Sequence, residues 1–266
     1  MTYAILDSNS AVSQRNTVTA LAVMAKAPRA GKVKTRLSPP LTMEQCAEIN
    51  ICFLQDTTRN IAQVASSSPS TGMVCYTPAG DEGAFDGLLP EGFSLICQRG
   101  SGFGERLLCA AQDILACGFG SVCLIDSDSP TLPAAALTEA VRELNRPGDR
   151  IVLGGSDDGG YYLIGLKQAH TRVFEEITWS TSRVYAETVE RVREIGVPLV
   201  ELPLWYDVDD AATLRTASDE LLRMCPPHFA QTAGYNAHET RGFLLKLEDL
   251  HGSRREQDMA GDMQWA

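Results

Sequence analysis

Short apolar runs alternate along the chain with longer segments in which apolar residues recur every three or four positions. The apolar runs, each short enough to be a buried strand, cover 19–25, 71–77, 93–97, 122–125, 150–153, 161–166 and 199–202. The segments with helical spacing cover 42–64, 100–118, 134–144, 182–195 and 210–224. Strands that alternate with helices predict an α/β fold, with an open, mostly parallel central sheet and helices on both of its faces.

The two ends of the chain differ from this regular middle part. We expect a single domain over 19–224, a polar extension over 1–18, and an extension over 225–266 that is partly helical or loose. Within the last extension, 240–250 has the spacing of an amphipathic helix. Residues 1–16 lack the basic start and apolar core of a secretory signal, and no apolar run approaches the roughly 18 residues of a membrane span. We therefore expect a cytoplasmic protein.

Composition narrows the classes of partner. The 266 residues are 44% hydrophobic and 21% charged, as is typical of globular proteins. Lys and Arg number 23 against 34 Asp and Glu, which gives a net charge of −11 and argues against a protein that coats nucleic acid. The eight cysteines form no C-x-x-C pair, so we expect neither a disulfide framework nor a zinc site.

The densest basic segment follows the first predicted strand. Around Gly31 it places five positive charges in eleven residues: Lys26, Arg29, Lys32, Lys34 and Arg36. Ligands of open α/β sheets bind beyond the carboxyl ends of the strands, where backbone N–H groups and cationic side chains can hold a polyphosphate. We expect a phosphate-binding loop, with a solvated basic turn as the alternative. It is not a P-loop, because the Gly-Lys-Ser/Thr ending of that motif is absent.

Acidic residues follow several of the other predicted strands. Asp126 and Asp128 come directly after one of them, and Asp207 and Asp209 after another. Carboxylates at i and i+2 of an extended segment project to the same side, roughly 6 to 7 Å apart, so each pair can share a divalent cation such as Mg²⁺ or Mn²⁺. Helix capping is the alternative for both pairs, with Asp209 or Asp210 as the cap of the second.

A third acidic segment combines two carboxylates with glycines. Asp157, Asp158, Gly159 and Gly160 lie between two predicted strands, ahead of Tyr161. Glycine lets the backbone approach a ligand closely, and the two carboxylates there can bind hydroxyl groups, hold a metal or accept a proton. An ordinary Asp-Gly hairpin turn is the alternative.

Six ordered motifs between about residues 20 and 214 resemble the DUF2064 family of glycosyltransferase-like proteins, which is related to phospholactate guanylyltransferases. They are 24–37 (MAKAPRAGKVKTRL), Gln98 with 104–107 (GERL), 125–130 (IDSDSP), 158–165 (DGGYYLIG), 177–180 (ITWS) and 207–209 (DVD). The resemblance implies the nucleotide-diphospho-sugar transferase fold, known as GT-A, in which a strand-end Asp and a later Asp hold the metal that bridges the nucleotide phosphates.

Residue by residue, the resemblance assigns roles to both kinds of segment. Asp128 matches the acid before Ser/Cys-Pro, and Asp209 or Asp207 matches the later acid. The basic loop is matched by Lys32, Lys34 and Arg36. In two places the chain departs from the family: Asp126 replaces a Gly, which leaves Asp126 peripheral as an alternative, and Ser129 replaces a frequent Cys.

These observations together predict a metal-dependent transferase that uses an activated nucleotide. The leading hypothesis is glycosyl transfer from a nucleotide sugar to a small acceptor. Nucleotidyl transfer from a nucleoside triphosphate to a phosphorylated acceptor, with release of pyrophosphate, is the alternative, and an inactive nucleotide-sugar-binding subunit is a second one.

Within this hypothesis we expect Asp128 and Asp158 to be catalytic, with Asp158 orienting the acceptor or acting as general base. Residues expected at the acceptor are Asp157, Gly159, Gly160, Tyr161 and Trp179. A core position is the alternative for Trp179. The helix start at Gly104, Glu105 and Arg106 is expected to contact the nucleotide or acceptor, with a local Glu105–Arg106 pair as the alternative.

Overall fold

The computed structural model describes residues 3–8 and 15–262, and the side chains of these residues up to 250. Eight strands form one sheet in the order β1-β4-β3-β2-β5-β7-β6-β8. Their bounds are β1 Ala4–Ile5, β2 Arg15–Lys26, β3 Ser70–Thr77, β4 Ser94–Cys97, β5 Phe119–Ile125, β6 Ile151–Ser156, β7 Tyr161–Leu166 and β8 Leu199–Trp205. All neighbours are parallel except β7, which runs antiparallel to β5 and β6. The predicted α/β fold with a mostly parallel sheet is confirmed.

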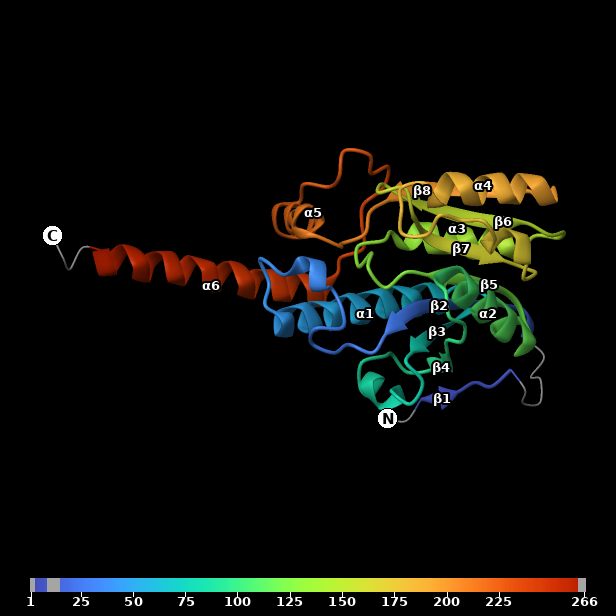
Figure 1. Ribbon diagram of the computed structural model, residues 1–266, viewed down its shortest axis with the longest axis horizontal. Helices are drawn as coiled ribbons and strands as arrows, with labels where there is room; N and C mark the ends of the chain where they lie inside the picture. Colours follow the sequence, from blue (N-terminus) through green and yellow to red (C-terminus); the bar gives the residue numbers. More distant parts are fainter. Residues whose placement is uncertain (1–2, 9–14, 263–266) are drawn as a thin grey trace.

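Helices cover both faces of the sheet (Figure 1). They are α1 Met43–Ala65, α2 Phe103–Ala116, α3 Ala134–Leu144, α4 Val184–Ile195, α5 Ala211–Arg223 and α6 His238–Asp262. One buried cluster joins the sheet to α1, α3, α5 and α6, and a second joins it to α2 and α4. Alternate residues of β2 serve the two clusters, because side chains alternate across a strand: Leu21 and Val23 enter the first, and Ala20 and Ala22 the second.

The ends of the chain are more structured than the sequence pattern predicts. β1 lies within the polar leader and pairs with β4, and β2 begins at Arg15, four residues before the predicted run. At the other end, α6 starts beside α1 and then extends away from the body as one long helix (Figure 1). Within residues 3–8 and 15–262, no helix is both long and apolar enough to cross a membrane.

The topology brings several loops to one edge of the sheet. The loops after β2, β5 and β8 leave the carboxyl ends of parallel strands, and the antiparallel β7 starts at the same edge. Two backbone hydrogen bonds hold these loops together: Val208 N–H donates to the Asp128 carbonyl at 2.8 Å, and Asp126 N–H donates to the Tyr162 carbonyl at 2.9 Å. Acidic residues far apart in the sequence therefore meet at this edge, as the strand-end argument predicts.

Candidate active site

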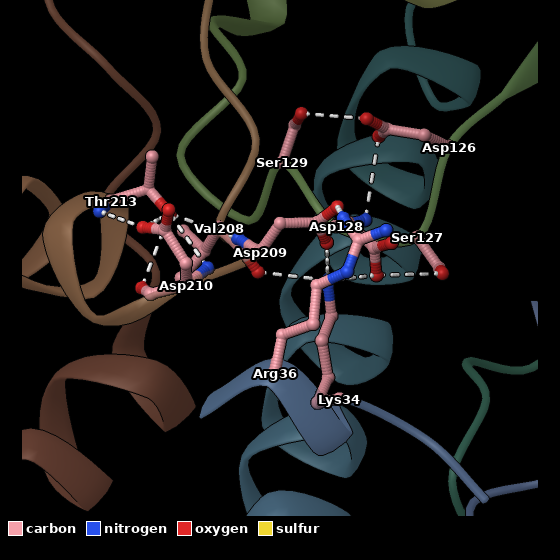
Figure 2. Close-up of polar contacts among 10 residues, drawn as sticks. All are labelled: Lys34, Arg36, Asp126, Ser127, Asp128, Ser129, Val208, Asp209, Asp210 and Thr213. Carbon is pink, nitrogen blue, oxygen red and sulfur yellow. Dashed lines mark hydrogen bonds and ion pairs between the residues drawn. The ribbon is translucent and has the colours of Figure 1, made fainter. Parts of the chain in front are cut away.

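A buried lysine joins two of the predicted acidic segments. Lys34 Nζ lies 2.8 Å from Oδ1 of Asp128 and 2.8 Å from Oδ1 of Asp209, and it also donates to the carbonyl of Val208 at 2.8 Å (Figure 2). All three N–H donors of the ammonium group thus have a partner at hand. Burial lowers the pKa of Lys34, but the two carboxylates outweigh burial, and the net direction is upward. The lysine is therefore held as a cation.

The loop after β2 places Lys34 in this position. Lys34 precedes the short 3-10 helix Thr35–Leu37 and has a left-handed backbone, with φ of 48°. Leu37 is fully buried and anchors this turn on the core. Arg36 leaves the same turn, with its side chain 75% exposed, and its guanidinium lies 3.7 Å from Asp209.

Asp209 is available to Lys34 because its neighbour caps the helix. Asp210 accepts hydrogen bonds from the N–H groups of Ala212 and Thr213, and the Thr213 side chain completes the capping box. The capping alternative is therefore confirmed for Asp210 and does not apply to Asp209, whose carboxylate faces Lys34 (Figure 2).

Asp126 is turned back onto its own loop. Its Oδ2 accepts a hydrogen bond from the Ser129 hydroxyl at 2.8 Å (Figure 2). Burial, together with repulsion from Asp128 and Asp207, raises the pKa of Asp126 well above the usual range. Its position therefore agrees with the peripheral alternative better than with direct metal binding, although its carboxyl group still lines a hollow beside Asp128.

Asp207 lies near Asp158, Asp209 and Asp128 and forms no ion pair with a described side chain. No hydrogen bond or ion pair of its carboxylate occurs among the side chains that the structure describes. Burial raises the pKa of Asp207 to about 7, with further contributions from Asp158, Asp209 and Asp128. An opposite charge brought to this place would relieve that repulsion.

The predicted metal ligands can be tested against this geometry. Among the described side chains, no three His, Cys, Asp or Glu are grouped so as to hold a metal ion as they stand. The place between Asp128 and Asp209 is taken by the Lys34 ammonium. The donor set nevertheless suits Mg²⁺ or Mn²⁺, because it consists of carboxylate oxygens and because Asp207 forms no ion pair among the described side chains.

Two adjoining hollows meet at these acids. We call the first the basic hollow; it has a volume of about 470 Å³. Its charged lining groups are five cations and two carboxylates: Lys26, Lys32, Lys34, Arg36, Arg106, Asp128 and Asp209. The guanidinium of Arg106 has no carboxylate partner among the described side chains, and its buried Nε has no hydrogen-bond partner there. A cationic hollow with an unpaired guanidinium suits an anionic ligand such as a polyphosphate.

The second, which we call the acidic hollow, has a volume of about 410 Å³. Its charged lining groups are five carboxylates and one guanidinium: Asp126, Asp128, Asp158, Asp207, Asp209 and Arg36. Asp128, Asp209 and Arg36 line both hollows and form the wall between them. The two kinds of charge that the sequence contains are therefore separated into neighbouring compartments.

The turn between β6 and β7 carries Asp158 to the acidic hollow. Asp158 Oδ1 accepts the N–H of Gly160 at 2.7 Å, which orients the exposed carboxylate. Gly159 has φ of +91°, and a Cβ there would lie 2.2 Å from the Ser182 carbonyl oxygen, so only glycine fits this turn. The hairpin alternative is thus correct for the backbone, while the Asp158 side chain still lines the hollow.

Aromatic side chains form the opposite part of the acidic hollow. Trp179 makes edge-to-face contacts with Phe103, at a centroid distance of 5.2 Å, and with Tyr161, at 6.4 Å. All three rings line the hollow, and the half-buried Trp179 also packs against the second core cluster, so the core alternative holds for part of its surface. Gly104 makes room for the indole, since a Cβ there would lie 2.6 Å from Trp179 Nε1.

Several predicted site residues do not line either hollow. Arg29 pairs with Asp81, and Glu105 accepts hydrogen bonds from the N–H and hydroxyl of Ser101, which makes it part of the start of α2. Four other predicted site residues also line neither hollow: Gly31, Gly104, Asp157 and Gly159.

Other lining residues were missed by reasoning from the sequence. Thr181 and Ser182 line the acidic hollow, Asn50 and Thr77 line the basic one, and Phe103 lines both. Ser180 lines both hollows and has a left-handed backbone, with φ of 62°. The motif that contains Trp179 continues directly into Ser180, Thr181 and Ser182, and this continuity is the signal that could have found them.

The family DUF2064, described as uncharacterized protein conserved in bacteria, matches residues 60–181. The predicted resemblance is confirmed over these residues, and the motifs at 24–37 and 207–209 lie outside the matched segment. The crystal structure of a proposed nucleotide-diphospho-sugar transferase from Desulfovibrio desulfuricans is 26% identical in sequence, with a TM-score of 0.72; the match covers 90% of this chain and 97% of that one. The chain therefore has the GT-A type of α/β domain, and this likeness indicates a transferase.

More distant structures resemble the chain at lower scores. The 4-diphosphocytidyl-2C-methyl-D-erythritol synthase of Anaerococcus prevotii is 10% identical over 78% of this chain and 97% of that one, with a TM-score of 0.49. Rv0371c of Mycobacterium tuberculosis, in complex with manganese, is 13% identical over 74% of this chain and 96% of that one, with a TM-score of 0.44. No curated protein sequence matches the chain.

Proposed function

We propose that this protein is a divalent-metal-dependent glycosyltransferase that moves a sugar from a nucleotide-diphospho-sugar to a small acceptor. The observation that carries this proposal is the shared wall of Asp128, Asp209 and Arg36 between a basic and an acidic hollow. A donor molecule of this kind has an anionic end and an uncharged end joined at the reacting bond. The charges of the two hollows match that division, and the likeness to the Desulfovibrio protein supports the same choice.

The diphosphate would lie in the basic hollow. Lys26, Lys32 and Arg106 line it without a carboxylate partner among the described side chains, so they are available for phosphate oxygens. Lys34 is committed to Asp128 and Asp209 in this structure. Because both of its carboxylate partners lie at the shared wall, a small rotation of its flexible stem can carry the ammonium from these carboxylates to the phosphates.

Asp128, Asp207 and Asp209 would hold the divalent cation. When bound, Mg²⁺ or Mn²⁺ supplies positive charge that stabilises the leaving nucleoside diphosphate. The chain's own residues continue that neutralisation, since Arg36 stands on the same wall and Arg106 lines the same hollow.

Asp158 is placed to act on the acceptor. With Oδ1 held by the Gly160 N–H, Oδ2 is available to an acceptor hydroxyl in the acidic hollow. The acceptor oxygen forms a bond to the anomeric carbon, the bond from that carbon to the diphosphate oxygen breaks, and the hydroxyl proton passes to Asp158. The nucleoside diphosphate leaves with the electron pair of the broken bond.

Nucleotidyl transfer is the second candidate. The observation that favours it is the number of cations in the basic hollow, since five cationic side chains suit a triphosphate as well as a diphosphate. In that case the phosphorylated acceptor would attack the α-phosphorus, and pyrophosphate would leave.

A binding panel followed by product analysis tests these proposals. Thermal unfolding is measured with nucleoside triphosphates and nucleotide sugars, with and without Mn²⁺; a ligand at about 100 times its Kd adds ~2.7 kcal/mol to stability. Release of a nucleoside diphosphate from the best ligand supports glycosyl transfer, and release of pyrophosphate supports nucleotidyl transfer instead. Binding without turnover indicates a binding subunit. If no nucleotide stabilises the wild type more than it stabilises Asp128→Ala, the hypotheses of glycosyl transfer, nucleotidyl transfer and a binding subunit are all wrong.

A further inference from the structure

Carboxylates dominate the charged lining of the acidic hollow. Of its six charged lining groups five are carboxylates, and the single cation, Arg36, is 75% exposed and lies beside Asp209. Lys26, Lys32 and Arg106 line the other hollow only. An anionic group placed beside Asp158 would therefore meet the negative charge of that carboxylate, and Arg36 is the only cationic side chain among the residues that line the hollow.

The same hollow has the features that bind uncharged hydroxyl compounds. Phe103, Tyr161 and Trp179 offer apolar ring surface on which the C–H face of a ring can pack. Four Ser and Thr hydroxyl groups also line it: those of Ser156, Ser180, Thr181 and Ser182. Carboxylates such as Asp158 accept hydrogen bonds from hydroxyl groups, and none of these interactions needs a charge on the ligand.

The division between the hollows adds a positional argument. Phosphates are drawn to the basic hollow by five cations, and Asp128 and Asp209 stand between that hollow and the acidic one. A phosphorylated acceptor would have to place a second anionic group beyond this wall.

We infer that the acceptor bound in the acidic hollow is an uncharged hydroxyl compound with an apolar ring face, and that acceptors with a phosphate or carboxylate group are rejected. The inference rests on the proposed glycosyl transfer and narrows its acceptor class. It also separates the two candidate reactions, since nucleotidyl transfer to a phosphorylated acceptor would require cations where this hollow has carboxylates.

Matched pairs of acceptors test the inference. The full-length protein, Mn²⁺ and the best nucleotide sugar of the binding panel are combined with neutral ring alcohols and, in parallel, with the phosphate ester of each alcohol. Release of the nucleoside diphosphate is compared with the rate in water alone. The neutral member of a pair should have a kcat/KM at least about tenfold higher than its phosphate ester, which corresponds to ~1.4 kcal/mol.

Substitutions at Asp158 and Trp179, with Asp86 as a control position, test whether these residues cause the preference for neutral acceptors. Asp158→Asn removes one carboxylate. It should therefore reduce the ratio of kcat/KM for the neutral alcohol to kcat/KM for its phosphate ester, even where both values fall. Asp86→Asn changes an exposed acid that follows the short 3-10 helix Glu82–Phe85, away from the hollow, and should leave the ratio of the two kcat/KM values unchanged. Trp179→Ala should raise the KM of the neutral acceptor by about tenfold, and Trp179→Phe should restore much of it.

The outcomes separate the inference from the proposal on which it depends. If the phosphate esters are used equally well or better, or if no neutral alcohol accelerates release beyond the rate in water, the inference is wrong. Slow release of the nucleoside diphosphate in water would in that case still support glycosyl transfer. If no nucleotide sugar is turned over at all, the proposed function fails and the inference fails with it.

Discussion

The ammonium group of Lys34 lies 2.8 Å from Oδ1 of Asp209, although the two residues are 175 positions apart in the chain. Only 5% of the lysine side chain is exposed. The same ammonium contacts Asp128, so one cation holds together the loops after β2, β5 and β8. In the structure, Lys34 thus supplies positive charge at the place where the proposed function puts the divalent cation.

Replacing Lys34 with Met should destabilise the metal-free protein. Two carboxylates would then face each other without a counter-ion. Loss of one partner of a buried pair costs up to about 5 kcal/mol, but Asp128 and Asp209 are 31% and 42% exposed, so we expect about 1–3 kcal/mol. Urea denaturation in the presence of EDTA measures the change. Lys32→Met, an exposed lysine of the same loop, is the matched control and should cost less than about 0.5 kcal/mol.

Mn²⁺ should reverse part of that loss. With the ammonium removed, the carboxylates are free to take the cation, so Mn²⁺ should raise the urea midpoint of Lys34→Met more than that of the wild type. Equal effects of Mn²⁺ on both proteins would mean that Lys34 and the metal do not share these carboxylates.

Arg106 should contribute directly to nucleotide binding. Its guanidinium lines the basic hollow without a carboxylate partner among the described side chains, and it stacks near Phe103 at 5.8 Å. A hydrogen bond to a charged group contributes about 1.5–3 kcal/mol, so Arg106→Gln should weaken the nucleotide Kd at least about tenfold by calorimetry. Arg29→Gln is the comparison, because Arg29 is paired with Asp81 and should change the Kd less than about twofold. If the two variants weaken binding equally, the basic hollow does not hold the phosphates.

Asp128 and Asp126 should differ in their effect on metal binding. Asp128 contacts Lys34 at the shared wall, whereas Asp126 accepts a hydrogen bond from Ser129 in its own loop. Asp128→Asn should weaken Mn²⁺ binding, followed by electron paramagnetic resonance in the presence of the nucleotide, by about tenfold or more. Asp126→Asn keeps an acceptor for Ser129 and should have the smaller effect. The reverse order would show that Asp126 is a direct ligand.

Much of the fold and part of the site follow from the sequence pattern. Apolar runs of strand length between helical segments specify the sheet, and the edge at which Asp128 and Asp209 meet follows from the carboxyl ends of parallel strands. The capping role of Asp210 also follows from local pattern, since the cap, Thr213 and the start of α5 are adjacent in the chain.

The remaining features of the site depend on contacts between residues far apart in the sequence. Nothing near Arg29 in the sequence indicates that Asp81 neutralises it, and nothing near Lys34 indicates that it lies between Asp128 and Asp209. The five basic residues look equivalent in the sequence because spacing fixes where a side chain starts, not which group it meets. The same reason explains why Asp126, at i−2 from Asp128, turns to Ser129 instead.

Asp207 should make the metal-free protein less stable as the pH rises. Its pKa is about 7 in the folded protein, above the value of about 3.9 for an unfolded chain, so the folded state binds the proton more tightly. The resulting stability is present below about pH 4 and is lost as the pH rises through 7. Asp207→Asn removes this dependence and should exceed the wild type by about 1–3 kcal/mol at pH 8 in EDTA, with little difference at pH 4.

Denaturant midpoints of both proteins over pH 4–8 measure that difference. Other carboxyl groups with a raised pKa, such as those of Asp126 and Glu220, are present in both proteins. Their contributions to the pH dependence of stability therefore cancel in the comparison. Asp86→Asn, in an exposed turn, should follow the wild type throughout. A constant difference between Asp207→Asn and the wild type at every pH would mean that Asp207 does not titrate in this range.

Asp56 should hold the start of α6 on the body of the protein. This α1 residue is 1% exposed, and its carboxylate accepts the N–H groups of Glu239 and Thr240, at 3.1 and 2.8 Å, and the Thr240 hydroxyl at 2.7 Å. Asp56 thus caps the N-terminus of α6, although it belongs to α1. Asp56→Ala leaves these buried donors without a partner and should cost about 2 kcal/mol, with faster amide exchange in the first turns of α6.

Two further variants make this last prediction specific. Asp56→Asn keeps a carbonyl acceptor and should lose less stability than Asp56→Ala. Arg59→Ala removes only the exposed pair between Arg59 and Glu239, and should cost less than about 1 kcal/mol. If Asp56→Ala is as stable as the wild type and α6 exchanges at an unchanged rate, the apolar contacts of residues such as Leu244 hold the helix without the cap.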